Sequence, residues 1–172
     1  MANDNILNIY IANLGKYNEG ELKGGWISLP VSEDELNSFL EETVGINGHY
    51  EEWAIHDWES DFFTGIGEYD DIYKLNEKAE RFEGLNDYEL RTLKAAAEVW
   101  GNEALEFDLD DLVLYDSVFT DYDLGYYWAE ESGCYQLSGP LAQYFDYERF
   151  GRDIDLETDG GYSFYGYIEY RG

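Results

Sequence analysis

Carboxylates are the chemically capable side chains in greatest supply, since the 172-residue chain holds 39 Asp and Glu against 10 Lys and Arg. Two acids beside aromatic platforms form the machinery of a glycoside hydrolase. Among so many acids, however, some pair at a suitable spacing is expected by chance. A carbohydrate-cleaving enzyme is therefore a weak hypothesis, and we predict no catalytic residue and no enzyme activity.

One stretch resembles an EF-hand calcium loop but lacks an essential ligand. Asp155, Glu157, Asp159 and Gly160 match positions 1, 3, 5 and 6 of an EF-hand loop. Position 12, where a bidentate Glu is needed, is Gly166. Residues 155–157 are therefore predicted to be a solvated acidic loop.

The remaining candidates for metal or nucleophilic chemistry are sparse. His49, His56 and Cys134 are too few and too scattered for a zinc site. We expect His56 to be a strand residue with a satisfied ring and Cys134 to be a small buried residue. Residues 65–67, Gly-Ile-Gly, lack the third glycine of a phosphate-binding turn. No cofactor and no metal are predicted.

The charge itself needs an explanation. A formal net charge of -29 would suggest disorder, but 44% hydrophobic and 18% aromatic residues are enough for a core. Solubility alone requires a net charge of only about 2–8 in magnitude. Adaptation to high salt is one explanation. Direct nucleic-acid binding is excluded because phosphates would be repelled, so the expected partner carries a strongly basic surface.

The acids are spread along the chain and leave two long windows without Lys or Arg, residues 24–73 and 95–148. A charge of -29 equals the phosphates along about 50 Å of duplex DNA. An elongated shape would lower the self-repulsion and approach the charge density of DNA. The acids expected to take the place of phosphates are Glu33, Asp34, Glu41, Glu42, Glu51, Glu52, Asp57, Glu59, Asp61, Asp70, Asp71, Glu103, Glu106, Asp108, Asp110, Asp111, Asp116, Asp121, Asp123, Glu130 and Glu131.

These acids must be positioned by folded elements, and residues 1–62 are predicted to form a small sheet with one helix. Ser32 with Glu35 is typical of a capping box, and Gly45 ends the helix. Residues 15–20 are predicted to be a turn or loop. Alternating apolar residues predict strands over 7–13, 26–29 and 53–58.

Residues 63–104 are predicted to be a helical middle domain. The first helix buries Ile72, Leu75, Ala79 and Phe82 and ends at Gly84. The second begins at Asn86 and ends at Gly101, and the two could pack as a hairpin.

Residues 105–172 are predicted to be a C-terminal α+β domain. It has a strand over 112–115, a helix from Thr120 to Gly133, and a strand-like stretch over 162–170. Pro140 suits the first turn of a further helix, with Leu141, Tyr144 and Phe145 facing inward. The predicted fold class is thus α+β, as an elongated chain of three small domains with an acidic surface.

The N-terminus has no basic region followed by a long apolar run, which argues against a signal peptide. No apolar stretch approaches the ~18 residues of a membrane span. The expectation is a cytoplasmic protein without a membrane partner.

Three ordered stretches resemble the ArdA antirestriction family. Residues 9–22 followed by Gly25-Trp26 are similar to the start of these proteins, and residues 50–59 are similar to a later segment. Residues 144–156 resemble the family's Tyr/Phe-Asp-Tyr…Gly-Arg-Asp stretch. The order and spacing also fit, over nearly the whole chain.

The resemblance implies a DNA mimic, encoded on conjugative plasmids, transposons or phages, that inhibits type I restriction–modification enzymes and protects incoming mobile DNA. It also implies a curved homodimer of three-domain subunits. The partner would be the methyltransferase core with its specificity subunit. The dimer contact would lie near the antirestriction motif, around residues 136–147, and would involve Leu137, Leu141, Tyr144, Phe145 and Tyr147. The alternative hypothesis is a general acidic adaptor or chaperone for basic DNA-binding proteins.

Overall fold

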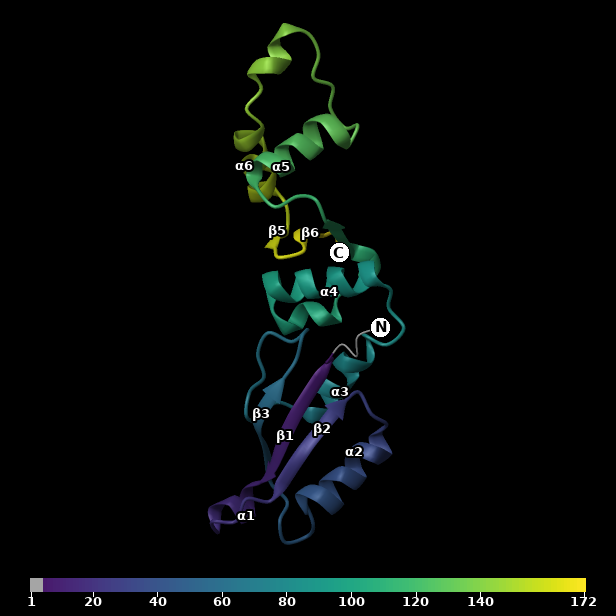
Figure 1. The fold of residues 1–172 in the computed structure, drawn as a ribbon, viewed down its shortest axis with the longest axis vertical. Coiled ribbons are helices and arrows are strands. Elements are labelled where there is room, and N and C mark those ends of the chain that lie inside the picture. Colours follow the sequence, from purple (N-terminus) through teal and green to yellow (C-terminus); the bar gives the residue numbers. More distant parts are fainter. Residues whose placement is uncertain (1–4) are drawn as a thin grey trace. The chain divides into compact units, whose positions relative to one another are not determined.

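Two three-stranded antiparallel sheets organise the chain, each in its own compact unit (Figure 1). The computed structural model describes residues 5–172. The first unit ends at Leu85, and the second covers Asn86–Gly172. The fold class is α+β, as predicted. The division into three domains stays a prediction.

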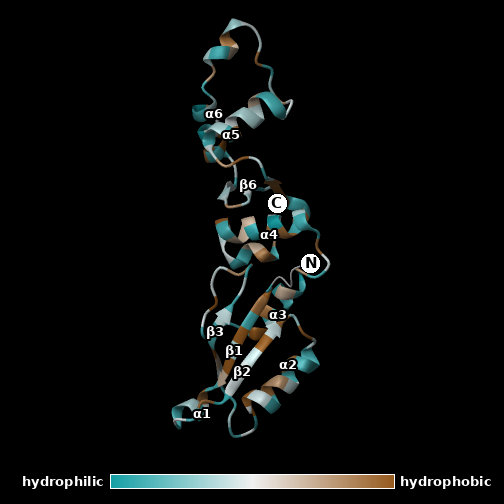
Figure 2. Ribbon diagram, viewed as in Figure 1, coloured by the Kyte–Doolittle hydropathy of each residue, from teal (hydrophilic) through white to brown (hydrophobic). Residues whose placement is uncertain are grey.

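The sheet of the first unit consists of β1 (Leu7–Asn13), β2 (Gly24–Leu29) and β3 (Trp53–Glu59), in the order β2-β1-β3. The three predicted strands are confirmed. Leu7, Ile9 and Ile11 of β1 are buried because alternate side chains of a strand share one face. Figure 2 shows apolar residues concentrated in β1, whereas much of α1 and α6 is hydrophilic.

The turn or loop predicted at residues 15–20 is only partly present. Residues 15–18 belong to the short helix α1 (Leu14–Asn18), and residues 19–20 form a turn. The cause of this helix is Asn13, whose buried side chain accepts a hydrogen bond from the Lys16 N–H at 3.0 Å. The same side chain donates to the carbonyl oxygens of Val44 and Gly45, both at 3.2 Å. One buried amide thus caps a helix and ties it to a distant turn.

Helix α2 (Glu33–Phe39) continues into a π-helical turn, Leu40–Val44, and ends at Gly45 with a φ of 79°. The Ser32 hydroxyl accepts from the Glu35 N–H at 3.3 Å, as predicted. The reciprocal half of the capping box does not form within residues 5–172. Leu36, Leu40 and Val44 are buried, which fixes this helix against the sheet.

Helix α3 (Ile72–Glu80) completes the first unit. Ile72, Leu75, Ala79 and Phe82 are all buried, which confirms the predicted face, and the helix contacts β2. Its N-cap is Asp71, whose carboxylate accepts from the Tyr73 N–H at 3.0 Å.

Helix α4 (Asp87–Trp100) opens the second unit with the predicted capping box, because Asn86 and Glu89 exchange side chain–backbone hydrogen bonds. It packs on a sheet of β4 (Leu112–Tyr115), β6 (Gly166–Tyr170) and β5 (Gly160–Ser163), in that order. Two 3-10 turns, Asn102–Glu106 and Leu109–Asp111, connect α4 to β4.

Helices α5 (Asp121–Tyr126) and α6 (Tyr147–Glu157) pack against each other. Thr120 caps α5 as predicted, and a π-helical turn, Tyr127–Glu131, prolongs it to Ser132. The acidic loop predicted at residues 155–157 is wrong, since these residues form the last turn of α6. The capping carboxylate of Asp146, which accepts from the Arg149 N–H at 3.0 Å, starts that helix.

Candidate functional site

The first acidic face lies on α2 and the turn that follows it. Leu36 and Leu40 point into the core, whereas acids before Leu36 and after Leu40 face solvent. The exposed acids on this face are Glu33, Asp34, Glu35, Glu41 and Glu42. Within residues 5–172 none of them forms an ion pair with Lys or Arg, so their charges are not cancelled locally.

A second acidic group accompanies β3. Glu51 and Glu52 precede the strand, and Asp57 and Glu59 lie within it; all four are exposed. The pairing of β3 with β1 shifts register between Tyr10 and Ile11, which leaves one extra residue, His56, on the β3 side. Such a bulge turns neighbouring side chains away from their regular positions.

The third acidic group follows α4 in the second unit. Glu103, Glu106, Asp108 and Asp110 are exposed on the two 3-10 turns. Glu130 and Glu131 are exposed at the end of the turn after α5.

Several of the predicted phosphate substitutes also hold the fold. Asp71 and Asp108 are helix caps, and Asp70 accepts from the Gly67 N–H at 2.8 Å. Asp116 lies 3.4 Å from Arg91. Of the predicted set, Asp111, Asp121 and Asp123 are half-buried, and the others are exposed. The structure therefore distributes the set over both units and does not gather it into one pocket.

Asp121 is the acid most engaged in structure. Its carboxylate lies 3.4 Å from the Arg152 guanidinium and accepts a hydrogen bond from the Tyr162 hydroxyl at 2.9 Å. Burial, and then this hydrogen bond to Asp121, raises the pKa of Tyr162. Arg152 belongs to the Gly-Arg-Asp stretch, so part of that motif fixes α6 to the start of α5.

A tyrosine hydroxyl can hold a carboxylate without cancelling its charge. Tyr147 donates to Glu130 at 2.6 Å, and this hydrogen bond raises the pKa of Tyr147 to about 12. A Lys or Arg in the same place would fix the carboxylate but neutralise it. The Tyr147 hydroxyl therefore holds the Glu130 carboxylate in a defined position and brings no positive charge to it.

The predicted dimer motif is exposed only in part, since Leu137, Phe145 and Tyr147 are half-buried in the single chain. Residues Pro140–Tyr144 form a 3-10 turn, and Leu141 and Tyr144 are 79% and 77% exposed. The prediction that these two face inward is wrong, because a single 3-10 turn offers no apolar stripe to a core. Phe145 does turn inward, with its ring 5.1 Å from Tyr147 and 5.3 Å from Phe150.

Cys134 and His56 complete the residues singled out for chemistry. Cys134 is exposed, so the expectation of a buried cysteine is wrong; it follows Gly133 in a polar surface turn. His56 lies in β3, as predicted, with its ring in edge contact with Tyr17 at 5.0 Å. Among the described residues, no three His, Cys, Asp or Glu side chains converge as metal ligands.

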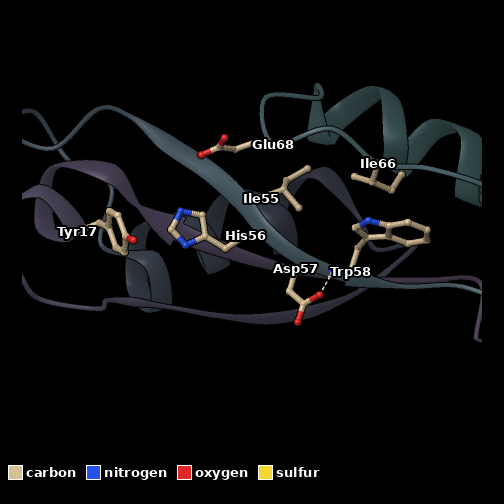
Figure 3. A pocket seen from close by; sticks show the side chains of 7 residues that line it. All are labelled: Tyr17, Ile55, His56, Asp57, Trp58, Ile66 and Glu68. Carbon is tan, nitrogen blue, oxygen red and sulfur yellow. Dashed lines mark hydrogen bonds between the residues drawn. The ribbon is translucent and has the colours of Figure 1, made fainter.

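An open pocket of about 500 Å³ lies beside the bulge of β3 in the first unit. Figure 3 shows Tyr17 and His56 at one end, Trp58 and Ile66 at the other, and the carboxylates of Glu68 and Asp57 on opposite sides. Sequence patterns did not indicate this pocket, because it depends on the register shift and on the segment before Glu68. The main chain of that segment meets β3 through a hydrogen bond from the Ile55 N–H to the Glu68 carbonyl at 2.8 Å.

These features define a folded acidic protein with exposed carboxylates in both units. No helix within residues 5–172 is long and apolar enough to cross a bilayer. A model of the antirestriction protein (ArdA) family matches residues 9–169. The chain belongs to the ArdA family of antirestriction proteins. A comparison with individually curated proteins gives no match.

Family membership confirms the predicted resemblance and implies an antirestriction function. Proteins of this family are inhibitors of restriction enzymes. The matched residues include β1 from Ile9 onward, β2 and β3, both base-free windows and the Gly-Arg-Asp stretch.

Proposed function

We propose that the protein is a DNA mimic that occupies the DNA-binding groove of a type I restriction–modification enzyme and thereby protects incoming mobile DNA. The observation that carries the proposal is the exposure of carboxylates on α2, along β3 and on the turns after α4. Within residues 5–172, those on α2 and the turn that follows it form no ion pair with Lys or Arg. A groove that binds DNA is lined with Lys and Arg, and such acids can take the place of phosphates there.

The mechanism we infer is replacement of DNA by equivalent charge. Each carboxylate that pairs with a groove cation displaces an ion that would otherwise accompany it, so affinity falls steeply as salt rises. Phosphate contacts carry no sequence information. A charge mimic can therefore inhibit enzymes with different recognition sequences, and it acts in the cytoplasm, where those enzymes meet incoming DNA.

We further propose that two copies associate through the exposed motif around Pro140–Tyr144. Two large apolar side chains, Leu141 and Tyr144, are 79% and 77% exposed and lie three residues apart on this turn. Their burial against a second copy would remove that exposure. A dimer also doubles the length of acidic surface available to a long groove.

The decisive experiment is competition on a purified type I methyltransferase core with its specificity subunit. A fluorescent duplex containing the recognition sequence is bound first, and the protein is then titrated in at several salt concentrations. Full displacement, with an inhibition constant that weakens steeply with salt, is the expected result. Binding without displacement, or equal binding to unrelated basic proteins, would favour a general acidic adaptor instead.

A further inference from the structure

The pocket beside the β3 bulge differs from the rest of the acidic surface because it adds aromatic rings to carboxylates. Its lining includes three rings, those of Tyr17, His56 and Trp58. It also includes two carboxylates, Asp57 and Glu68, neither of which forms an ion pair within residues 5–172. The remaining lining residues are Ile55 and Ile66.

The cap of α1, the bulge in β3 and a hydrogen bond to Asp57 fix the side chains that line the pocket. Asn13 caps α1 and so places Tyr17, whose ring meets the His56 ring edge-on at 5.0 Å. His56 is the extra residue of the β3 bulge and has no partner residue on β1, so the regular alternation of side chains is interrupted there. The Asp57 carboxylate accepts a hydrogen bond from the Trp58 N–H at 2.9 Å, which fixes its direction. Bulges of this kind recur next to binding sites because they re-aim side chains.

We propose that this pocket receives an arginine side chain of the basic partner. A guanidinium is planar and weakly hydrated, stacks on aromatic faces, and pairs with carboxylates through a fork of N–H donors. Aromatic faces at both ends and a carboxylate on either side match that chemistry (Figure 3). An ammonium, as a compact and strongly hydrated charge, uses the rings less well.

The inference rests on the proposed function, since the arginine is taken to come from the DNA-binding groove. It adds specificity to a mechanism that is otherwise a sum of similar charges. Buried or stacked arginines concentrate binding energy at a few points of an interface, whereas exposed ion pairs contribute little each. The pocket would then be a point of fixed register between the mimic and its target.

The test uses the intact protein and N-acetyl-arginine amide as the probe, followed by ¹H–¹⁵N NMR at constant pH and ionic strength. The expected result is a saturable set of shifts confined to the amides of Tyr17, residues 55–58 and residues 66–68. N-acetyl-citrulline amide, which is neutral and of similar shape, should give none, and N-acetyl-lysine amide should bind at least several-fold more weakly.

Matched variants separate the pocket from general charge. Asp57→Asn with Glu68→Gln should weaken probe binding at least tenfold, whereas Glu41→Gln with Glu42→Gln, which removes the same charge from α2's turn, should leave it unchanged. Trp58→Leu should weaken binding, and Trp26→Leu, at an exposed position of β2, should not. Shifts spread evenly over all acidic faces, or equal effects of the paired variants, would overturn the proposal.

The outcome is independent of the enzyme competition. Arginine binding confined to the pocket, together with failure to displace DNA, would support the arginine site and contradict the proposed enzyme target. Displacement of DNA without arginine binding would keep the mimic and remove the pocket.

Discussion

Gly125 of α5 and Gly151 of α6 face each other where the two helices cross. A Cβ built on Gly125 would overlap the Tyr147 carbonyl oxygen and lie 2.8 Å from the Gly151 nitrogen. A Cβ built on Gly151 would overlap the Asp121 carbonyl oxygen and lie 2.7 Å from the Gly125 nitrogen. The backbones therefore touch directly, which explains in physical terms why a glycine stands in the Gly-Arg-Asp stretch.

Gly151→Ala is expected to destabilise the second unit by about 3 kcal/mol, the upper end of overpacking penalties, because the obstacle is backbone and cannot rotate away. Urea unfolding followed by circular dichroism measures the change. Gly48→Ala is the control, since nothing lies within 4 Å of a Cβ there, and it should be neutral or slightly stabilising. Equal stability of Gly151→Ala and the parent would contradict the close crossing.

Tyr167→Phe and Tyr162→Phe should differ in their effect on stability, and only Tyr162→Phe should destabilise the protein. Both tyrosines lie in the C-terminal hairpin, and the Tyr162 hydroxyl donates to Asp121 at 2.9 Å. The buried Tyr167 hydroxyl forms no hydrogen bond of regular geometry among the described residues, although burial and the nearby Asp155 carboxylate raise the pKa of Tyr167. Removal of an unsatisfied buried hydroxyl is expected to be neutral or to stabilise by about 1 kcal/mol. Loss of a hydrogen bond to a carboxylate should cost about 1.5–3 kcal/mol.

Thermal unfolding of the two variants in parallel measures the difference. A loss of stability in Tyr167→Phe equal to that in Tyr162→Phe would mean that the Tyr167 hydroxyl has a partner in solution.

The sequence predicted the elements whose signals are local. The strands over residues 7–13 and 112–115 and the capped helices from Ser32, Asn86 and Thr120 are all present. Alternation and caps depend on residues within a few positions of each other, so the pattern alone suffices.

The misses have a common physical cause. Helix α6 was not predicted because Gly151 interrupts its apolar pattern. The reason for a glycine at this position is its close contact with Gly125, which is distant in sequence. Leu141 and Tyr144 were predicted inward on side-chain type alone, although the turn that carries them meets no core. The pocket beside β3 depends on a register shift between two strands, which no pattern within one strand records.

Alkaline pH is expected to destabilise the second unit through its tyrosines. The pKa of Tyr147 is raised to about 12 in the folded protein, against about 10 in an unfolded chain. Between these values the folded state holds the proton and the unfolded state has lost it, so stability is fully present below about pH 10 and falls as pH rises toward 12. Burial raises the pKa of Tyr115 as well, which acts in the same direction.

The midpoint of urea unfolding at about pH 9 and about pH 11.5, at fixed ionic strength, tests the sign. Tyr147→Phe should show a smaller loss between the two values than the parent. Tyr69→Phe, at a residue that is 72% exposed, should show the parent's full loss. A loss unchanged in Tyr147→Phe would disprove the contribution of its bond to Glu130.

Leu141→Ser with Tyr144→Ser should give a folded monomer if the exposed motif forms the proposed dimer contact. The two side chains are 79% and 77% exposed, so the single chain loses almost no packing when they are replaced. Sedimentation velocity measures the association state and circular dichroism the fold. Leu156→Ser is the control, because Leu156 is 78% exposed on α6, outside the motif, and should remain dimeric. A double variant that stays dimeric would place the contact elsewhere.

Single replacements of exposed acids should be nearly silent in inhibition, whereas combined replacements should add up. An exposed ion pair contributes about 0–1 kcal/mol, so any one change alters the inhibition constant only a few-fold. Neutralising Glu33, Asp34, Glu41 and Glu42 together should weaken inhibition of a type I enzyme by about 2 kcal/mol, which is about 30-fold, and should reduce its dependence on salt.

The same charge change is not equivalent everywhere. Glu19 and Glu21 lie 3.6 and 3.2 Å from Lys16, so their carboxylates already have a cation. Glu19→Gln with Glu21→Gln should therefore weaken inhibition less than Glu41→Gln with Glu42→Gln, whose carboxylates form no ion pair within residues 5–172. Abolition of inhibition by replacing one acid on α2 would point to a specific site instead of a sum of charges. Equal effects of the two double variants would mean that local ion pairing does not decide which acids contribute.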